Sequence, residues 1–156
     1  MSQSTTSRSC PERPVEQCTS ARPRVVAARI EPPVLQVAFP PTPTAVAGMR
    51  EMTKCFLELT ELKGLLACNV VLAVSELVTN AVRHGHGPVE LAVRAVGGVL
   101  TVSVTDENPA PAVLKEVGPD ELSGRGIALV ASVSDEWGSS GEETWCEFRY
   151  EAGSAA

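Results

Sequence analysis

The chain has 156 residues, 44% of them hydrophobic, which is enough for one domain with a hydrophobic core and short for two. The formal net charge of −6 and the pI near 5.0 argue against direct binding to nucleic acid or to a membrane surface, because these polyanions select clustered Lys and Arg. The five cysteines are scattered without C-x-x-C spacing, so we expect reduced thiols and a cytoplasmic location.

Residues 1–31 differ in composition from the rest of the chain. Ser, Thr, Pro and Arg dominate them, and the prolines prevent a continuous helix. The apolar stretch of a secretory signal is absent near Met1. We therefore predict a disordered tail over residues 1–31, one ordered domain over residues 32–151 and a short C-terminal tail over residues 152–156.

The domain begins with a predicted strand and a predicted helix. Residues 34–39 alternate well enough for a strand, and the prolines that follow forbid its extension. Thr44 can cap a helix that ends near residues 62–64. The apolar positions of this helix recur at steps of three and four residues: Val46, Met49, Met52, Cys55, Phe56 and Leu59. We expect Cys55, and Cys68 beyond it, to be small core residues and not nucleophiles.

A second helix is predicted over residues 66–84, where Gly85 and Gly87 end it. One face of this helix carries the apolar residues Val70, Val74, Leu77, Val78 and Ala81. We expect no apolar run near the roughly 20 residues that cross a bilayer, since Asn69 cuts the richest stretch, residues 65–74, and Ser75-Glu76 follow it. The same helix also carries a stripe of polar residues beside its apolar face.

Two β-rich runs follow the second helix. They cover residues 89–96 and 99–105, and Gly97-Gly98 between them suits a tight hairpin turn. Residues 107–123 are rich in Pro, Gly and acidic side chains and are too long for a simple turn. We expect this segment to be a mobile lid.

A short helix and a hairpin are predicted at the C-terminal end of the domain. Residues 126–133 have helical apolar spacing, and strands around Trp137 and over residues 144–151 would pair across residues 138–141. Trp137 and Trp145 are expected to pack. The order of strands and helices predicts an α+β fold, a two-layer α/β sandwich with a mixed, mostly antiparallel sheet and helices on one face.

Glu76 and Asn80 form the first candidate functional pair. Their four-residue spacing places both on one face of the second helix, and Arg83 or His84 extends this polar stripe. A carboxylate beside an apolar face is costly without a partner, and a metal ion with a polyphosphate would supply one. Asn80 offers the kind of oxygen that Mg²⁺ prefers, which leaves Glu76 free to accept a proton.

Two further positions carry binding chemistry. Asp106 ends a predicted strand, where its carboxylate can accept a hydrogen bond from the exocyclic amine of adenine. Gly124-Arg125-Gly126 stands where a helix begins, so backbone N–H groups and the helix dipole favour an anion such as phosphate. Taken singly, each pattern also occurs without a ligand, as a solvated helix face, a turn-forming Asp or a plain glycine connection.

Three segments together resemble the sequence boxes of a known family. Residues 75–85, SELVTNAVRHG, are similar to the N-box of Bergerat-fold (GHKL) ATPases. Thr105-Asp106 is similar to the G1 box, and residues 123–127, SGRGI, are similar to the G2 box. Within this family the chain most resembles bacterial anti-sigma factor serine/threonine kinases of the short actinobacterial type. The resemblance spans roughly residues 34–150.

The resemblance implies ATP and Mg²⁺ as ligands and a role for each candidate residue. Glu76 matches the general base of the family, Asn80 its Mg²⁺ ligand and Asp106 the carboxylate that reads adenine. The other implied nucleotide-binding residues are Arg83, His84, Gly124, Arg125, Gly126 and Thr144. The lid would close over the nucleotide.

The chain departs from the family pattern at two places. Glu107-Asn108-Pro109 replaces the glycines that often follow the G1 aspartate, and this sequence is stiffer than glycine. Glu142-Glu143 stands where related short members tend to have a lysine before the threonine, so an acidic pair enters a region near the nucleotide.

Three functions are open at this point. The leading one is an anti-sigma-type regulator that binds a sigma factor and uses Mg-ATP to phosphorylate an anti-anti-sigma-type protein on Ser or Thr. The second is a catalytically inactive regulator that binds proteins in a nucleotide-dependent way. The third, the catalytic half of a split histidine kinase, is disfavoured because we find no helical dimerisation segment with a phospho-accepting histidine. The resemblance also allows a homodimer, without direct contact to nucleic acid or membrane.

Overall fold

The computed structural model describes residues 32–113 and 125–151. The elements follow one another as β1 (Val34–Phe39), α1 (Ala45–Leu59), α2 (Gly64–His84), β2 (Val89–Val96), β3 (Val99–Thr105), α3 (Gly126–Val133), β4 (Glu136–Ser140) and β5 (Glu143–Arg149). This order is the predicted one, and the bounds of β1, β2, β3 and α3 agree with the prediction. The predicted tails, residues 1–31 and 152–156, lie outside the described residues.

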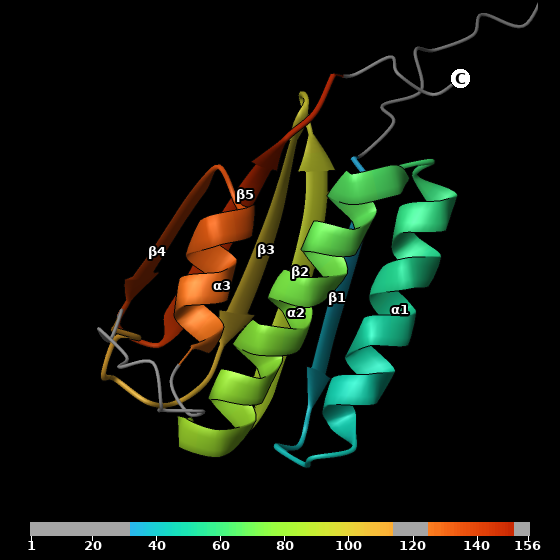
Figure 1. Cartoon of the computed structure of the whole chain (residues 1–156). Coiled ribbons are helices and arrows are strands. Elements are labelled where there is room, and N and C mark those ends of the chain that lie inside the picture. Colours follow the sequence, from blue (N-terminus) through green and yellow to red (C-terminus); the bar gives the residue numbers. More distant parts are fainter. Residues whose placement is uncertain (1–31, 114–124, 152–156) are drawn as a thin grey trace, which may run out of the picture. The chain divides into compact units, whose positions relative to one another are not determined.

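The described strands form one sheet in the order β1-β2-β3-β5-β4. Figure 1 shows α1, α2 and α3 side by side on one face of this sheet, which confirms the predicted α+β two-layer sandwich. Each neighbouring pair of strands is antiparallel, so the described sheet is not mixed as we predicted. The reason is that β1, α1, α2 and β2 each run opposite to the element before, which brings β2 back antiparallel to β1 (Figure 1).

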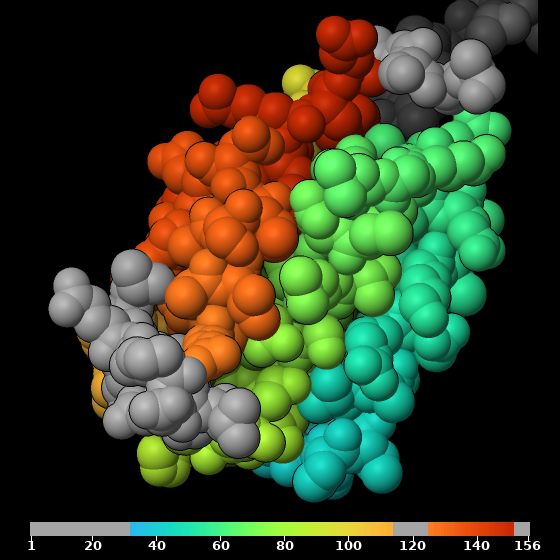
Figure 2. Space-filling view, viewed as in Figure 1, coloured from blue at the N-terminus to red at the C-terminus, as the bar shows by residue number. Residues whose placement is uncertain are grey.

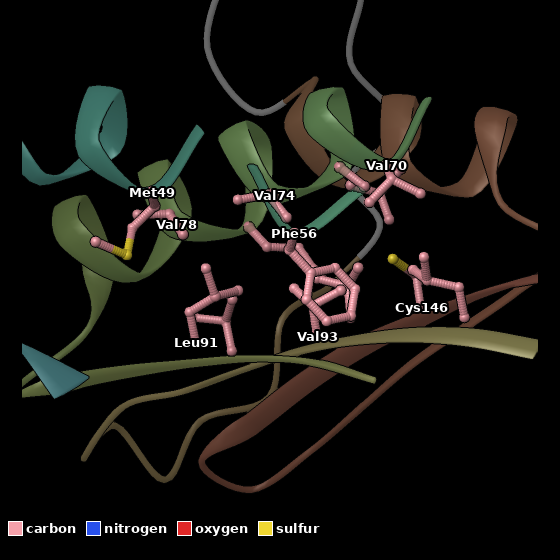
Figure 3. Close-up of a cluster of buried hydrophobic side chains, with 14 of the residues drawn as sticks. Met49, Phe56, Val70, Val74, Val78, Leu91, Val93 and Cys146 are labelled. Atoms are coloured by element: carbon pink, nitrogen blue, oxygen red, sulfur yellow. The ribbon is translucent and has the colours of Figure 1, made fainter. Parts of the chain in front are cut away.

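The hydrophobic core lies between the helices and the sheet. Figure 3 shows Phe56 of α1 and Val74 of α2 facing Leu91 and Val93 of β2, with Cys146 of β5 in the same cluster. All five apolar residues predicted for the second helix are buried, as expected. Burying one Val or Leu side chain is worth about 1.5–3 kcal/mol relative to exposing it, so this face holds α2 in one rotation on the sheet.

Helix α2 is apolar enough, by length and composition alone, to cross a membrane, since it has 21 residues and a mean hydropathy of 1.8. We expected no such stretch because Asn69 cuts the apolar run and Ser75-Glu76 follow it, but a mean taken over an 18-residue window tolerates these residues. In the structure Val70, Val74 and Val78 of this helix belong to the core against the sheet. The core helix of a soluble protein meets the same criterion, so the apolar composition of α2 is accounted for by packing.

The buried face of α1 differs from the prediction. The residues predicted as core but exposed in the structure are Met52, Cys55 and Leu59 of α1 and Cys68 of α2. Thr53 and Leu57 are buried in their place, together with the correctly predicted Met49 and Phe56. Thr53 tolerates burial because its hydroxyl donates a hydrogen bond to the carbonyl oxygen of Met49 at 2.7 Å. Because the polar Thr53 lies on the buried face of α1, the pattern of apolar residues alone predicted the wrong face for part of this helix.

Two predicted local signals have different outcomes. Thr44 occupies the N-cap position of α1, but its backbone is already helical, with φ −71° and ψ −23°, and its side chain makes no cap hydrogen bond. The predicted cap is therefore wrong, although the helix does begin at Ala45. Gly97 and Gly98 both adopt positive φ, 59° and 81°, as the primed turn between β2 and β3 requires.

The last hairpin turns at Gly141-Glu142 and not across residues 138–141, as we predicted. Gly138 lies inside β4, where the ring of Trp145 covers it. A Cβ atom at Gly138 would stand 2.7 Å from that ring. This glycine therefore marks a close approach of a side chain to the backbone, which looks like a turn signal in the sequence alone.

The three cysteines within the described residues should differ in reactivity. Cys146 is fully buried, and burial raises the pKa of its thiol to about 12, whereas Cys55 and Cys68 are exposed. At about pH 8 we expect iodoacetamide to alkylate Cys55 and Cys68 in the folded protein and to reach Cys146 only in denaturant, because the thiolate is the reactive form. Peptide mass mapping reads the result, and rapid alkylation of native Cys146 would contradict this core.

Candidate functional site

A cleft of about 500 Å³ opens beside the C-terminal half of α2. Its walls are that half of α2, the start of α3, the loop after β3 and the β4–β5 turn. Figure 1 shows these segments at the same end of the sheet, and Figure 2 shows α3 beside α2 on the helix face. Eight of the predicted site residues line the cleft: Glu76, Asn80, Arg83, His84, Asp106, Arg125, Gly126 and Thr144. The ninth, Gly124, lies outside the described residues.

Glu76 and Asn80 border the start of α3. Both side chains are partly buried, and they lie one turn apart on α2. A Cβ atom at Gly126 would stand 2.8 Å from Oε2 of Glu76, so the glycine lets α3 begin close to this carboxylate. The N-terminal N–H groups of α3 form the positive end of its dipole, which favours an anion at the same place.

Backbone groups surround Asp106 on another wall of the cleft. Its Oδ1 accepts a hydrogen bond from the N–H of Asn108 at 2.6 Å, and its own N–H donates to the carbonyl oxygen of Glu142 at 3.0 Å. Gly85 passes close to the carboxylate. A Cβ atom there would stand 2.6 Å from Oδ2 of Asp106 and closer still to the carbonyl oxygen of Ala81. Asp106 is thus held between the end of α2 and its own loop.

The loop after β3 is hydrogen-bonded to the end of α2. Nδ2 of Asn108 donates to the carbonyl oxygen of His84 at 2.9 Å. The N–H of Glu107 donates to the carbonyl oxygen of His86 at 2.8 Å. The beginning of the segment that we predicted as a mobile lid is therefore anchored, and residues 114–123 of that segment lie outside the described residues.

Ser139 is a residue of this region that the sequence analysis missed. Its Oγ lies 3.0 Å from Oγ1 of Thr144 and accepts a hydrogen bond from the N–H of Ala112 at 2.8 Å. It therefore ties the loop after β3 to the hairpin that carries Thr144. Ser139 pairs with Thr144 only when the hairpin turns at Gly141-Glu142. The turn predicted from the sequence lies elsewhere, so the sequence pattern did not indicate this contact.

Charges of both signs border the cleft. Arg83 and Arg125 are exposed among its lining residues and would attract a polyphosphate, and the exposed His84 lines the cleft beside them. Of the acidic pair that replaces the expected lysine, Glu142 lines the cleft and Glu143 does not. One additional carboxylate therefore faces any bound anion, and its repulsion is screened where the cleft is open to solvent.

The donor set fits a magnesium-bound nucleotide. The described residues contain no group of three or more His, Cys, Asp or Glu side chains that could hold a metal ion by themselves. Mg²⁺ typically keeps several waters and binds through one or two protein oxygens together with phosphate oxygens. The amide oxygen of Asn80 suits that mode of binding, because Asn80 lines the same cleft as the helix start at Gly126, where an anion such as phosphate would be favoured.

The comparisons with known proteins point in the same direction. The family described as "Histidine kinase-like ATPase domain" matches residues 39–149. No curated protein sequence matches the chain. A similar solved structure is that of the RsbU and RsbW domains of Rv1364c from Mycobacterium tuberculosis, with 20% sequence identity and a TM-score of 0.56. The similarity covers 76% of this chain and 32% of that longer chain. Because the sequence identity is only 20%, this likeness shows the fold alone.

The close approach at Gly85 can be tested by adding a single methyl group. Gly85→Ala would press Cβ against the Ala81 carbonyl and the Asp106 carboxylate, and we expect it to lower the free energy of unfolding by about 1–3 kcal/mol. Gly48→Ala is the matched control, because a Cβ at this helical position meets nothing within 4 Å. It should be neutral or stabilising by up to about 1 kcal/mol. Urea unfolding measures both, and equal stability of the two variants would contradict the packing at Gly85.

Proposed function

The chain belongs to the histidine kinase-like ATPase family, and from this we propose that it is an Mg-ATP-dependent protein serine/threonine kinase of the short actinobacterial anti-sigma type. In this proposal it binds a sigma factor in the cytoplasm and phosphorylates an anti-anti-sigma-type partner. The observation that carries the proposal is that residues from all three sequence boxes, Glu76, Asp106 and Gly126, line one cleft.

Asp106 and the start of α3 would set the direction of the nucleotide. The Asp106 carboxylate accepts a hydrogen bond from the adenine amine, and the phosphates extend toward the N–H groups at Gly126. The cleft volume of about 500 Å³ lies within the range of about 300–1,000 Å³ that is typical of small-molecule sites. Arg83 and Arg125 at the cleft add positive charge for the phosphates.

Glu76 would act as the general base. Its carboxylate lies beside Gly126, at the end of the cleft proposed for the phosphates. It takes the proton of a Ser or Thr hydroxyl of the partner as that oxygen bonds to the γ-phosphorus. The bond from the γ-phosphorus to the β–γ bridging oxygen breaks, and its electron pair leaves with ADP. Mg²⁺, held in part by Asn80, supplies charge neutralisation at the phosphates.

A catalytically inactive, nucleotide-dependent regulator is the second candidate. Glu142 among the cleft residues favours it, because its carboxylate opposes the negative charge of a bound triphosphate. The stiff Glu107-Asn108-Pro109 sequence also departs from the glycines common in the family. Both candidates share the binding site and differ only in whether Glu76 takes part in phosphoryl transfer.

Glu76→Gln separates these two candidates. This change keeps the size of the side chain and removes the base, so we expect phosphoryl transfer to fall by about 10²–10⁴-fold. ATP affinity should change by less than about threefold, since the base contributes mainly to the transition state. The assay is transfer from labelled ATP to the anti-anti-sigma-type proteins of the same genome, with calorimetry for binding.

Glu58→Gln is the control for this experiment, because Glu58 is exposed on α1 and does not line the cleft. It should leave both transfer and binding unchanged. Full transfer activity in Glu76→Gln would rule out Glu76 as the base. Tight ATP binding by the unmodified protein without transfer to any partner would favour the inactive regulator.

Asn80→Ala tests the proposed Mg²⁺ ligand. We expect Mg²⁺ to strengthen ATP binding to the unmodified protein by roughly tenfold or more, and the variant to lose most of this gain because one protein oxygen is removed. Calorimetric titration of ATP with Mg²⁺ and with EDTA measures the ratio. The control is Asn69→Ala on the same helix, where Asn69 does not line the cleft. An unchanged Mg²⁺ dependence in Asn80→Ala would remove Asn80 from the site.

A further inference from the structure

Asn108 occupies the middle of the sequence that departs from the family pattern, and it makes more side-chain contacts around Asp106 than a glycine can. Its Nδ2 donates to the carbonyl oxygen of His84, the last residue of α2, at 2.9 Å. Its Oδ1 accepts a hydrogen bond from the N–H of Ala110 at 3.1 Å. Both functional groups of the amide are therefore used, one toward the helix and one toward the loop.

The backbone of the same residue contacts the carboxylate that is proposed to read adenine. The N–H of Asn108 donates to Oδ1 of Asp106 at 2.6 Å, while Gly85 packs against Oδ2. The orientation of the carboxylate thus depends on where the Asn108 backbone sits. Pro109, which follows, has no N–H with which to hold the loop.

We propose that Asn108 is a positioning residue for adenine recognition. It links the loop after β3 to the end of α2 and so holds the Asp106 carboxylate toward the 6-amino group of the base. The inference rests on the proposed function, in which Asp106 accepts the hydrogen bond from that amine. It adds a specificity-determining role for a residue outside the sequence boxes.

The effect should be confined to the base end of the nucleotide. The proposed phosphate contacts lie at Gly126, on α3, which shares no hydrogen bond in the described residues with Asn108. Loosening the loop would let the Asp106 carboxylate move away from the amine without changing the helix start at Gly126. Discrimination between bases would fall, while binding of the triphosphate part would stay.

The test compares ATP with purine riboside triphosphate, in which hydrogen replaces the 6-amino group. Calorimetry gives the affinity of both nucleotides, with Mg²⁺, for the full chain and for two variants. Asn108→Ala removes the whole amide. Asn108→Ser keeps a small, neutral, polar side chain but shortens it and removes the amide donor to the His84 carbonyl, and it serves if the alanine variant folds poorly. Thermal unfolding of each protein is recorded in parallel.

Asn69→Ala is the matched control. Nδ2 of Asn69 also donates to a backbone carbonyl of another element, that of Val133, at 3.5 Å, but Asn69 does not line the cleft. The Asn69→Ala variant therefore removes a comparable hydrogen bond from an amide side chain to a backbone carbonyl, at a place outside the cleft. Its nucleotide discrimination should equal that of the unmodified protein.

We expect the unmodified protein to prefer ATP by about tenfold or more, as for a hydrogen bond to a charged group. In both Asn108 variants this preference should fall to about threefold or less, with the affinity for purine riboside triphosphate changed by less than about twofold. Equal weakening of both nucleotides, or a lower melting temperature with the preference intact, would overturn the positioning role alone. No preference for ATP in the unmodified protein would overturn the role of Asp106 and with it this inference.

Discussion

The packing of α2 on the sheet is the constraint on which the rest of the structure depends. Val74, Leu77 and Val78 are buried against the strands, which sets the rotation of the helix about its axis. With this rotation Glu76 and Asn80 cannot also face the sheet, and they border the start of α3 instead. One helix therefore supplies both the centre of the core and a wall of the cleft. Rotating α2 so that Glu76 and Asn80 left the cleft would expose its apolar residues to solvent.

Two glycines let the remaining walls approach this helix. Gly126 brings the start of α3 beside Glu76, and Gly85 brings the end of α2 beside Asp106. Each approach joins segments that are far apart in the chain, so the spacing within either segment alone does not produce it. The N-terminal N–H groups of α3, which donate hydrogen bonds, and the Asp106 carboxylate, which accepts them, therefore border the same cleft, and this is the arrangement on which the proposed binding of ATP depends.

The two departures from the family pattern can be explained by the contacts that their residues make. The glycines usual after the G1 aspartate would leave the loop flexible, whereas Asn108 uses its amide to tie the loop to α2. The hydrogen bonds of Asn108 therefore hold the Asp106 carboxylate in a defined place at the cleft. The two residues of the acidic pair lie in different elements: Glu142 is in the β4–β5 turn and lines the cleft, whereas Glu143 is the first residue of β5 and does not line it.

The sequence by itself determined the order of elements, the apolar face of α2 and the Gly97-Gly98 turn, because these depend on local periodicity and backbone preference. It indicated the residues that line the cleft only through their resemblance to the sequence boxes of the family. Only the tertiary structure decided that Thr53 of α1 is buried and where the last hairpin turns. It also decided the contacts of Asn108 and Ser139, which include hydrogen-bond partners 24 and 27 residues away in the chain, respectively. Such contacts depend on how distant segments pack, and local sequence patterns carry no record of that packing.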